Sequence, residues 1–157
     1  VGGNEKAYNL MLPLFEVMGK KSVLCGPASS GQAAKACNNM LLATTMIGVG
    51  EAFNLGENLG LDLKKLFDVL STSTGNCWAI NTYCPIEGVG PNSPADNNFQ
   101  PGFSGNLMLK DLTIALKAIK DTNTLAPFGT KSQENFKRMV DDKKGELDFS
   151  AIVNFNK

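Results

Sequence analysis

The chain has 157 residues, 43% of them hydrophobic, and its 15 basic and 15 acidic residues give a formal net charge of zero at pH 7. A chain of this length buries roughly 70% of the surface that it exposes when unfolded, so one domain with a substantial core fits. Neither sign of charge forms a long block, which argues against nucleic acid or an anionic membrane as the main partner and favours a small molecule or another protein.

Histidine is absent, and the four cysteines stand at positions 25, 37, 77 and 84. The commonest general base and the commonest metal ligand are therefore excluded. No pair of cysteines has Cys-x-x-Cys spacing, so we expect reduced thiols rather than a disulfide framework, and no metal site.

The first 25 residues have the rhythm of a strand, a helix and a second strand. Residues 1–3 read as a strand that ends in a turn, and residues 4–18 carry apolar side chains near the helical period before Gly19. Residues 22–24 read as a second short strand. From residue 26 onward the pattern is helical, which predicts a boundary between residues 25 and 26.

Polar residues of the stretch 26–39 stand at the entrance of an apolar helix. Ser29 and Gln32 have the spacing of a capping box, whereas Pro27 would alternatively suit the first helical turn. Either start places Lys35 and Asn39 one turn apart on the same helix face. An ordinary solvated first turn would explain these residues without any function.

The helix that begins here is expected to run over about residues 30–58, ending before Gly60, with a length of about 40 Å. Its apolar run, residues 40–50, is too short to span a membrane and indicates burial. Gly48, Gly50 and Gly56 predict close helix crossings, with a break near Gly48 as the alternative.

A proline-rich loop separates two groups of shorter helices. Residues 84–102 contain four prolines and cannot form regular structure throughout, while Phe99 and Phe103 indicate a loop that is ordered and packed on the body.

Caps and apolar periodicity predict the remaining helices. One capped by Asp62 covers residues 63–70, a helical turn covers 77–80, one capped by Ser104 extends to about residue 121, one after Pro127 covers about 128–144, and a short one follows Asp148. In the helix after Ser104 we expect these side chains to be buried: Leu107, Met108, Leu112, Ala115, Leu116 and Ile119.

Short sequence blocks over nearly the whole chain carry a family signature. The first is the pattern of Gly26, Gly31, Lys35, Asn38 and Asn39, and the others are Met46-Ile47-Gly48, Glu51-Ala52-x-Asn54-Leu55-Gly56, Leu59-Gly60-Leu61-Asp62, Cys77-Trp78, Asn97-Asn98-Phe99, Gly102-Phe103 and Leu109-Lys110-Asp111-Leu112. With them the chain resembles the C-terminal part of the β-hydroxyacid dehydrogenases, the family of 3-hydroxyisobutyrate dehydrogenase. It departs from the family pattern at Ser29, where the family has glycine, and we interpret this serine as a helix cap.

The resemblance implies a mainly α fold: an all-helical bundle around one long buried helix, like the C-terminal domain of 6-phosphogluconate dehydrogenase, preceded by a β-α-β remnant of a Rossmann domain. Residues 1–25 would be the tail of the NAD-binding domain, and residues 26–157 the helical catalytic and dimerisation domain. The Gly-x-Gly-x-x-Gly fingerprint that receives the pyrophosphate is not in this sequence. We therefore expect NAD to be bound mainly by a Rossmann domain outside these residues.

The resemblance also assigns roles to four residues. Lys35 matches the catalytic lysine, and Asn39 matches a substrate-binding asparagine. Gly31, one turn before Lys35 on the same helix face, offers bare backbone to the substrate. Lys110 and, less directly, Phe103 match positions near the nicotinamide end of the cofactor. An ordinary lysine is charged at neutral pH, so a lysine that accepts a proton needs desolvation, which a domain cleft would supply.

The implied reaction is the NAD-dependent oxidation of 3-hydroxyisobutyrate to methylmalonate semialdehyde, a step of valine degradation. The resemblance also implies that the enzyme is a homo-oligomer. The helical half alone is expected to be inactive. Tartronate or succinic semialdehyde reductases of the same family are an alternative, and a helical oligomerisation domain without catalysis is another. The location would be the mitochondrial matrix in a eukaryote and the cytoplasm in a bacterium.

Overall fold

The computed structural model describes residues 1–100 and 102–155, and within them all regular elements are helices. The fold is thus mainly α, as expected. The chain divides into two compact units, residues 1–38 and 39–157. Among the described residues no helix is long and apolar enough to cross a membrane.

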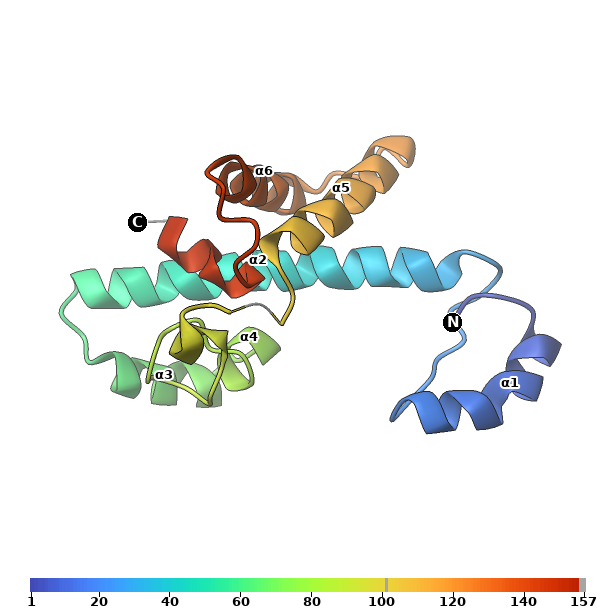
Figure 1. The fold of residues 1–157 in the computed structure, drawn as a ribbon, viewed down its shortest axis with the longest axis horizontal. Coiled ribbons are helices and arrows are strands. Elements are labelled where there is room, and N and C mark those ends of the chain that lie inside the picture. Colours follow the sequence, from blue (N-terminus) through green and yellow to red (C-terminus); the bar gives the residue numbers. More distant parts are fainter. Residues whose placement is uncertain (101, 156–157) are drawn as a thin grey trace. The chain divides into compact units, whose positions relative to one another are not determined.

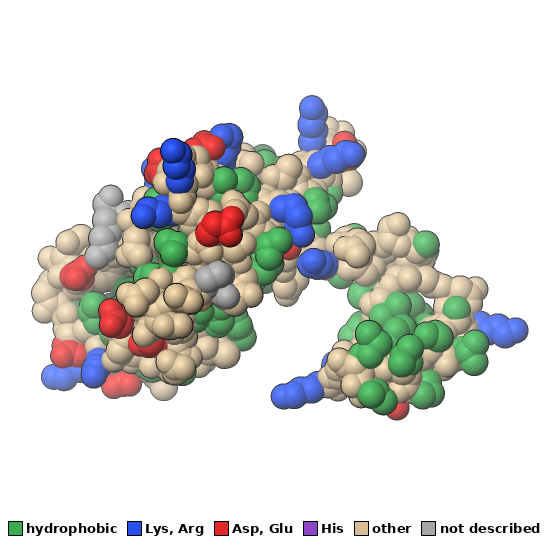
Figure 2. All heavy atoms as spheres, in the orientation of Figure 1, with side chains coloured by type: hydrophobic (Ala, Val, Ile, Leu, Met, Phe, Trp, Pro, Cys, Tyr) green, Lys and Arg blue, Asp and Glu red, His purple; other side chains and the backbone are tan. Residues whose placement is uncertain are grey.

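The first unit contains helix α1, Glu5–Met18, within the range that the sequence predicts. The side-chain oxygen of Asn4 accepts hydrogen bonds from the backbone N–H groups of Lys6 and Ala7, at 2.8 and 3.2 Å, and so caps the helix. No residue of α1 is buried. Figure 2 shows hydrophobic side chains gathered over this helix, and Leu10 and Val17 are 80% and 86% exposed.

The strands predicted on either side of α1 do not form as regular strands. The two segments lie side by side, since the amino group of Val1 donates to the carbonyl of Val23, Cys25 N–H donates to Val1, and Gly3 N–H donates to Gly26, all at 2.8 Å. Neither segment is assigned as a strand. Two extended segments without a third strand or a covering layer are marginal, and glycine weakens the first of them.

Helix α2, Ser30–Asn58, has the predicted bounds and is continuous through Gly48. Gly60 follows with φ +76°, the left-handed conformation that ends many helices. Close crossings occur at two of the three glycines, because a Cβ on Gly50 would press on Val153 and one on Gly56 would collide with Leu66. Gly48 has open space around it.

Burial of α2 is one-sided, so the burial that its apolar run indicates applies to one face of the helix. Its buried residues all belong to the second unit and are Asn39, Ala43, Met46, Ile47, Val49, Gly50, Phe53 and Gly56. The other face carries Leu41 and Leu55, which are 62% and 61% exposed.

The rest of the second unit surrounds the buried face of α2 with four α-helices and two short 3-10 helices. They are α3 (Leu63–Thr72), α4 (Trp78–Asn81), η1 (Pro94–Asn97), α5 (Gly105–Asp121), α6 (Pro127–Asp141) and η2 (Phe149–Phe155). Helices α5 and α6 lie on one side of α2, and α3 and α4 lie on the other (Figure 1). One apolar cluster joins α2, α4, α5, α6 and η2 through Met46, Phe53, Ile80, Leu112, Phe136, Phe149 and their neighbours.

These helices follow the predicted order and caps, with differences in detail. Asp62 and Ser104 cap α3 and α5 through their side chains, as predicted. Helix α6 ends at Asp141, three residues early, because Lys143 takes a left-handed φ of 59°. Leu107 is 45% exposed rather than buried.

The loop over residues 84–102 is ordered in the part that the structure describes, which excludes Pro101. It contains the short 3-10 helix η1, although its four prolines predicted little regular structure in this segment. Ser93 and Asp96 form a capping box around it, and backbone N–H groups of Gly88 and Ser93 hold the pKa of Asp96 below its usual value. Phe99 and Phe103 pack against the apolar cluster, as predicted.

A buried carboxylate, Asp148, ties the end of this loop to η2. Its Oδ2 accepts from Tyr83 Oη at 3.0 Å and from the N–H groups of Gly102 and Phe103 at 3.0 and 3.1 Å. Its Oδ1 accepts from the backbone N–H and the hydroxyl of Ser150, at 3.0 and 2.7 Å, which confirms the predicted cap. Burial and the nearby Asp148 carboxylate raise the pKa of Tyr83 above its ordinary value.

Removal of the Asp148 carboxylate is expected to lower the free energy of unfolding substantially. Asp148→Ala leaves the donors of Tyr83, Gly102, Phe103 and Ser150 without their acceptor, so we expect the free energy of unfolding to fall by about 3–5 kcal/mol in urea titrations. Tyr83→Phe removes one donor and should cost about 1–2 kcal/mol. Asp121→Ala, at an exposed carboxylate, is the control and should stay within about 0.5 kcal/mol. A loss below 1 kcal/mol for Asp148→Ala would contradict this role.

Candidate functional site

Two of the predicted site residues of the second unit meet at one carboxylate. Asn39, on the buried face of α2, donates from Nδ2 to Oδ2 of Asp111 at 2.6 Å. Lys110, the preceding residue on α5, places its Nζ 3.2 Å from Oδ1 of the same carboxylate. Asp111 therefore joins the predicted substrate-binding amide to the predicted cofactor-binding ammonium.

The three residues of this contact network, Asn39, Asp111 and Lys110, differ in burial. Asn39 and Asp111 are only 8% and 5% exposed, whereas the Lys110 side chain is 56% exposed. A buried hydrogen bond to a charged acceptor contributes about 1.5–3 kcal/mol, while an exposed ion pair contributes up to about 1 kcal/mol. The Asn39 contact thus fixes the carboxylate, and the ammonium group of Lys110 remains open to a ligand.

Lys35 lies on α2 four residues before Asn39, so the continuous helix directs both side chains to one face, as predicted. Lys35 is exposed and belongs to the first unit.

Position 31 requires glycine because the backbone of residues 1 and 2 passes close to it. A Cβ there would approach the backbone N of Gly2 to 3.0 Å and the carbonyl carbon of Val1 to 3.1 Å, so any larger residue would displace residues 1 and 2. Gly31 also lines a hollow of about 340 Å³ together with Val1, Gly2, Ser29 and Gln32. Its bare backbone serves this close approach, and its role toward substrate stays a prediction.

The backbone of Ser29 departs from the extended conformation that the predicted capping box requires. Its φ is +76°, in the left-handed region, and it is the carbonyl oxygen that accepts the N–H groups of Gln32 and Ala33, at 3.0 and 3.1 Å. A positive φ suits glycine and strains other residues, which accounts for the family glycine at this position.

Phe103 is half-buried, and its ring meets Phe149 edge to face with centroids 5.8 Å apart. Phe149 in turn stacks on Tyr83, and Tyr83 stacks on the half-exposed Trp78 at 4.7 Å. Phe103 is thus one end of an aromatic row that packs on the core, and its contact with a cofactor stays a prediction.

Sequence reasoning missed the function of Asp111. A signal was available, because Asp111 follows Met108 by three residues and precedes Ala115 by four, which places it on the buried face of α5. A carboxylate on such a face requires partners.

The cysteines form no disulfide in the described part of the chain. All four cysteines are free, as predicted, and burial raises the pKa of the Cys84 thiol, which makes it a poor nucleophile. Within the described part of the chain, no group of three or more acidic or cysteine side chains could hold a metal ion.

Comparisons with known proteins give one consistent family. The family described as the NAD-binding domain of NADP-dependent 3-hydroxyisobutyrate dehydrogenase matches residues 29–156. A Mycobacterium tuberculosis protein named "probable 3-hydroxyisobutyrate dehydrogenase" is 47% identical over 153 residues, covering 98% of this chain and 52% of that protein. The mitochondrial 3-hydroxyisobutyrate dehydrogenase of Drosophila melanogaster is 41% identical over 157 residues, covering 100% of this chain and 48% of that enzyme.

Solved structures agree. The structure of 3-hydroxyisobutyrate dehydrogenase from Mycobacterium tuberculosis with L-serine superposes with a TM-score of 0.94 at 46% identity, over 99% of this chain and 53% of that one. The chain therefore spans about half the length of the relatives it matches.

The backbone strain at Ser29 predicts a stabilising substitution. Ser29→Gly should raise the free energy of unfolding by about 1 kcal/mol, because glycine adopts a φ of +76° without the Cβ clash. Ser30→Gly, at the first residue of α2, has no positive φ to relieve and should give no gain. Urea unfolding of both variants measures the difference, and equal effects would refute the strain.

The two contacts of Asp111 predict unequal stability losses. Asn39→Ala removes the buried hydrogen bond and should cost about 2 kcal/mol. Lys110→Ala removes an exposed ion pair and should cost less than about 1 kcal/mol. If thermal or urea unfolding shows the larger loss for Lys110→Ala, the carboxylate is fixed by the lysine instead.

Proposed function

Because this chain belongs to the 3-hydroxyisobutyrate dehydrogenase family, we propose that it is the helical half of an enzyme that oxidises 3-hydroxyisobutyrate to methylmalonate semialdehyde. The observation that carries the proposal is the Asn39, Asp111 and Lys110 constellation, with Lys35 one turn from Asn39 on the same helix. We infer further that this half resembles the C-terminal helical domain of 6-phosphogluconate dehydrogenase and acts in a homo-oligomer.

Residues 1–25 would be the tail of a nucleotide-binding Rossmann domain. Support comes from α1, whose large apolar side chains are exposed and which has no buried residue. An apolar face of this size is normally covered by another part of the protein. The parallel hydrogen bonds between residues 1–3 and 23–26 fit the edge of a parallel sheet.

In the reaction, NAD would supply the chemistry of accepting hydride from the alcohol carbon. The amine of Lys35 would take the hydroxyl proton as the carbonyl forms, and in the reverse direction its ammonium would return that proton. Asn39, held by Asp111, would orient the substrate through its amide, and Gly31 would leave room at the helix entrance.

Lys110 fits the cofactor side of this site. Its exposed ammonium is held near Oδ1 of Asp111 and can donate to a neighbouring polar group. Phe103, seven residues before Lys110, would offer its aromatic ring to the cofactor. The remaining contacts to NAD would come from the Rossmann domain, and closure of that domain would exclude water from Lys35.

The location follows the source of the protein. The Drosophila relative is named mitochondrial. We propose the mitochondrial matrix for a eukaryotic source, with a place in valine degradation, and the cytoplasm for a bacterial one.

Replacement of Lys35 tests the mechanism. In the full-length protein, Lys35→Ala should lower kcat/KM for 3-hydroxyisobutyrate by about 10²–10⁴, because the proton has no acceptor. Lys117→Ala, at an exposed lysine of α5, is the matched control and should keep normal turnover. Near-normal turnover of Lys35→Ala would refute the catalytic role, and a preference for tartronate or succinic semialdehyde in the wild-type protein would reassign the substrate.

A further inference from the structure

An apolar stripe runs along the face of α2 that the core of the second unit leaves uncovered. It consists of Leu41, Thr45, Gly48, Ala52 and Leu55, which are spaced alternately by four and three residues and so share one helix face. Leu41 and Leu55 are 62% and 61% exposed, and Gly48 is exposed between them. We call these five residues the outer stripe, and all of them belong to the second unit.

Gly48 differs from the other two glycines in the interior of α2. Glycine destabilises the interior of a helix relative to alanine, and Gly50 and Gly56 offset this cost by close contacts with Val153 and Leu66. No atom from another part of the described chain lies within 4 Å of the place where a Cβ of Gly48 would stand. The bare backbone of Gly48 thus allows a helix from outside the described residues to approach α2 closely.

The polar group of the outer stripe already has partners within its own helix. The hydroxyl of Thr45 donates to the backbone carbonyls of Leu41 and Leu42, both at 3.0 Å. Burial of Thr45 in an interface would therefore leave no donor unpaired. The remaining residues of the stripe are apolar, so covering it removes hydrocarbon from water.

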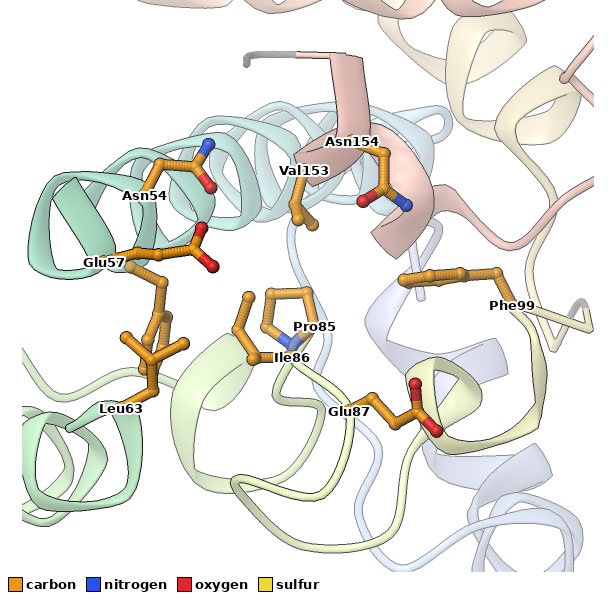
Figure 3. Close-up of a pocket in the computed structure, with 10 residues that line it drawn as sticks. Asn54, Glu57, Leu63, Pro85, Ile86, Glu87, Phe99, Val153 and Asn154 are labelled. Carbon is orange, nitrogen blue, oxygen red and sulfur yellow. The ribbon is translucent and has the colours of Figure 1, made fainter.

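The charges of α2 do not oppose contact between identical copies. Residues 40–58 carry two charged side chains, Glu51 and Glu57. Glu57 lines a small cavity beside Leu63, away from the outer stripe (Figure 3). Glu51 stands three residues after Gly48, so in two antiparallel helices that cross at Gly48 it would face position 45 of the other copy. Like charges, which would oppose association, would not meet.

The outer stripe is symmetric about Gly48. Leu41 precedes Gly48 and Leu55 follows it by seven residues, which is about 10 Å along the helix axis in either direction. Two copies of α2 that run antiparallel and cross at Gly48 would therefore place Leu41 of each against Leu55 of the other. A two-fold interface requires this self-complementarity, whereas contact with a different domain does not.

Apolar side chains of the connection between α5 and α6 widen the outer stripe at its Leu41 end. Gly129 of α6 has no room for a Cβ because Met40 of α2 packs against it, which places the start of α6 beside this end of the stripe. Here Leu125 and Phe128 are 91% and 75% exposed. A stable interface buries about 800 Å² on each partner, which calls for more than one helix face. The C-terminal end of α2 of an antiparallel copy would cover this extension.

We propose that the outer stripe is an interface between two copies of this chain, in which α2 crosses α2 of the other copy antiparallel at Gly48. A second copy is favoured over another domain of the same polypeptide by the symmetry of the stripe about Gly48. The proposal deepens the homo-oligomer of the proposed function and rests on that part of it alone. It does not depend on the dehydrogenase reaction.

Sedimentation equilibrium of the full-length protein with charged variants tests the interface. Leu41→Glu and Leu55→Lys should each weaken the association at least about 100-fold, because each variant buries two unpaired charges in the contact. An equimolar mixture of the two variants pairs glutamate with lysine at one contact and leucine with leucine at the other. This mixture, and the double variant Leu41→Glu/Leu55→Lys, should associate within about tenfold of wild type.

Val69→Glu, at an exposed apolar side chain of α3 outside the stripe, is the control and should associate within about twofold of wild type. Circular dichroism establishes that each variant is folded. A wild-type protein that is monomeric at about 10 µM would overturn the proposal, as would a folded Leu41→Glu that keeps the wild-type mass. Failure of both the mixture and the double variant to recover association would overturn the antiparallel crossing. Because sedimentation measures no turnover, a failure of the proposed reaction cannot be mistaken for a failure of the interface.

Discussion

The helical unit depends on a carboxylate that has been removed from water. Asp148 is fully buried, and five hydrogen bonds from four residues replace its hydration. These donors come from the segment after α4, from the end of the proline-rich loop and from the start of η2, segments that hydrophobic packing alone would leave free to slide. The charge therefore sets the register of the irregular parts against one another, while the apolar cluster supplies the bulk of the stabilisation.

Asp111 applies the same principle at the candidate site. One of its oxygens is held by a buried amide and the other faces an exposed ammonium, so a single side chain links the interior of α2 to the surface of α5. The Lys110 side chain is 56% exposed beside this carboxylate, which suits a group that contacts a ligand. An asparagine held by a buried carboxylate is rigid, which suits a group that orients one.

The sequence predicted local structure well because capping and periodicity are local. The bounds of α2 and the caps at Asp62 and Ser104 follow from residues within one or two turns. The other partners of Asp148 besides Ser150, and the Asn39 partner of Asp111, are 45 to 72 residues away along the chain, and no spacing rule reveals them. Ser29 was misjudged for a related reason: its residue type favours a cap, but the backbone path between Gly26 and Ser30 imposes a positive φ that overrides the preference.

Helix α1 shows what sparse tertiary packing means for a short helix. It has 14 residues, one of them Pro13, and no buried side chain, so within its own unit its stability rests on the Asn4 cap, on local propensity and on contacts such as the 2.7 Å hydrogen bond between the hydroxyl groups of Tyr8 and Ser22. Isolated helices of this length are marginal in water. Its amides would then exchange with solvent by local opening rather than by global unfolding, and α1 and the core of α2 would belong to separate cooperative units of the same chain.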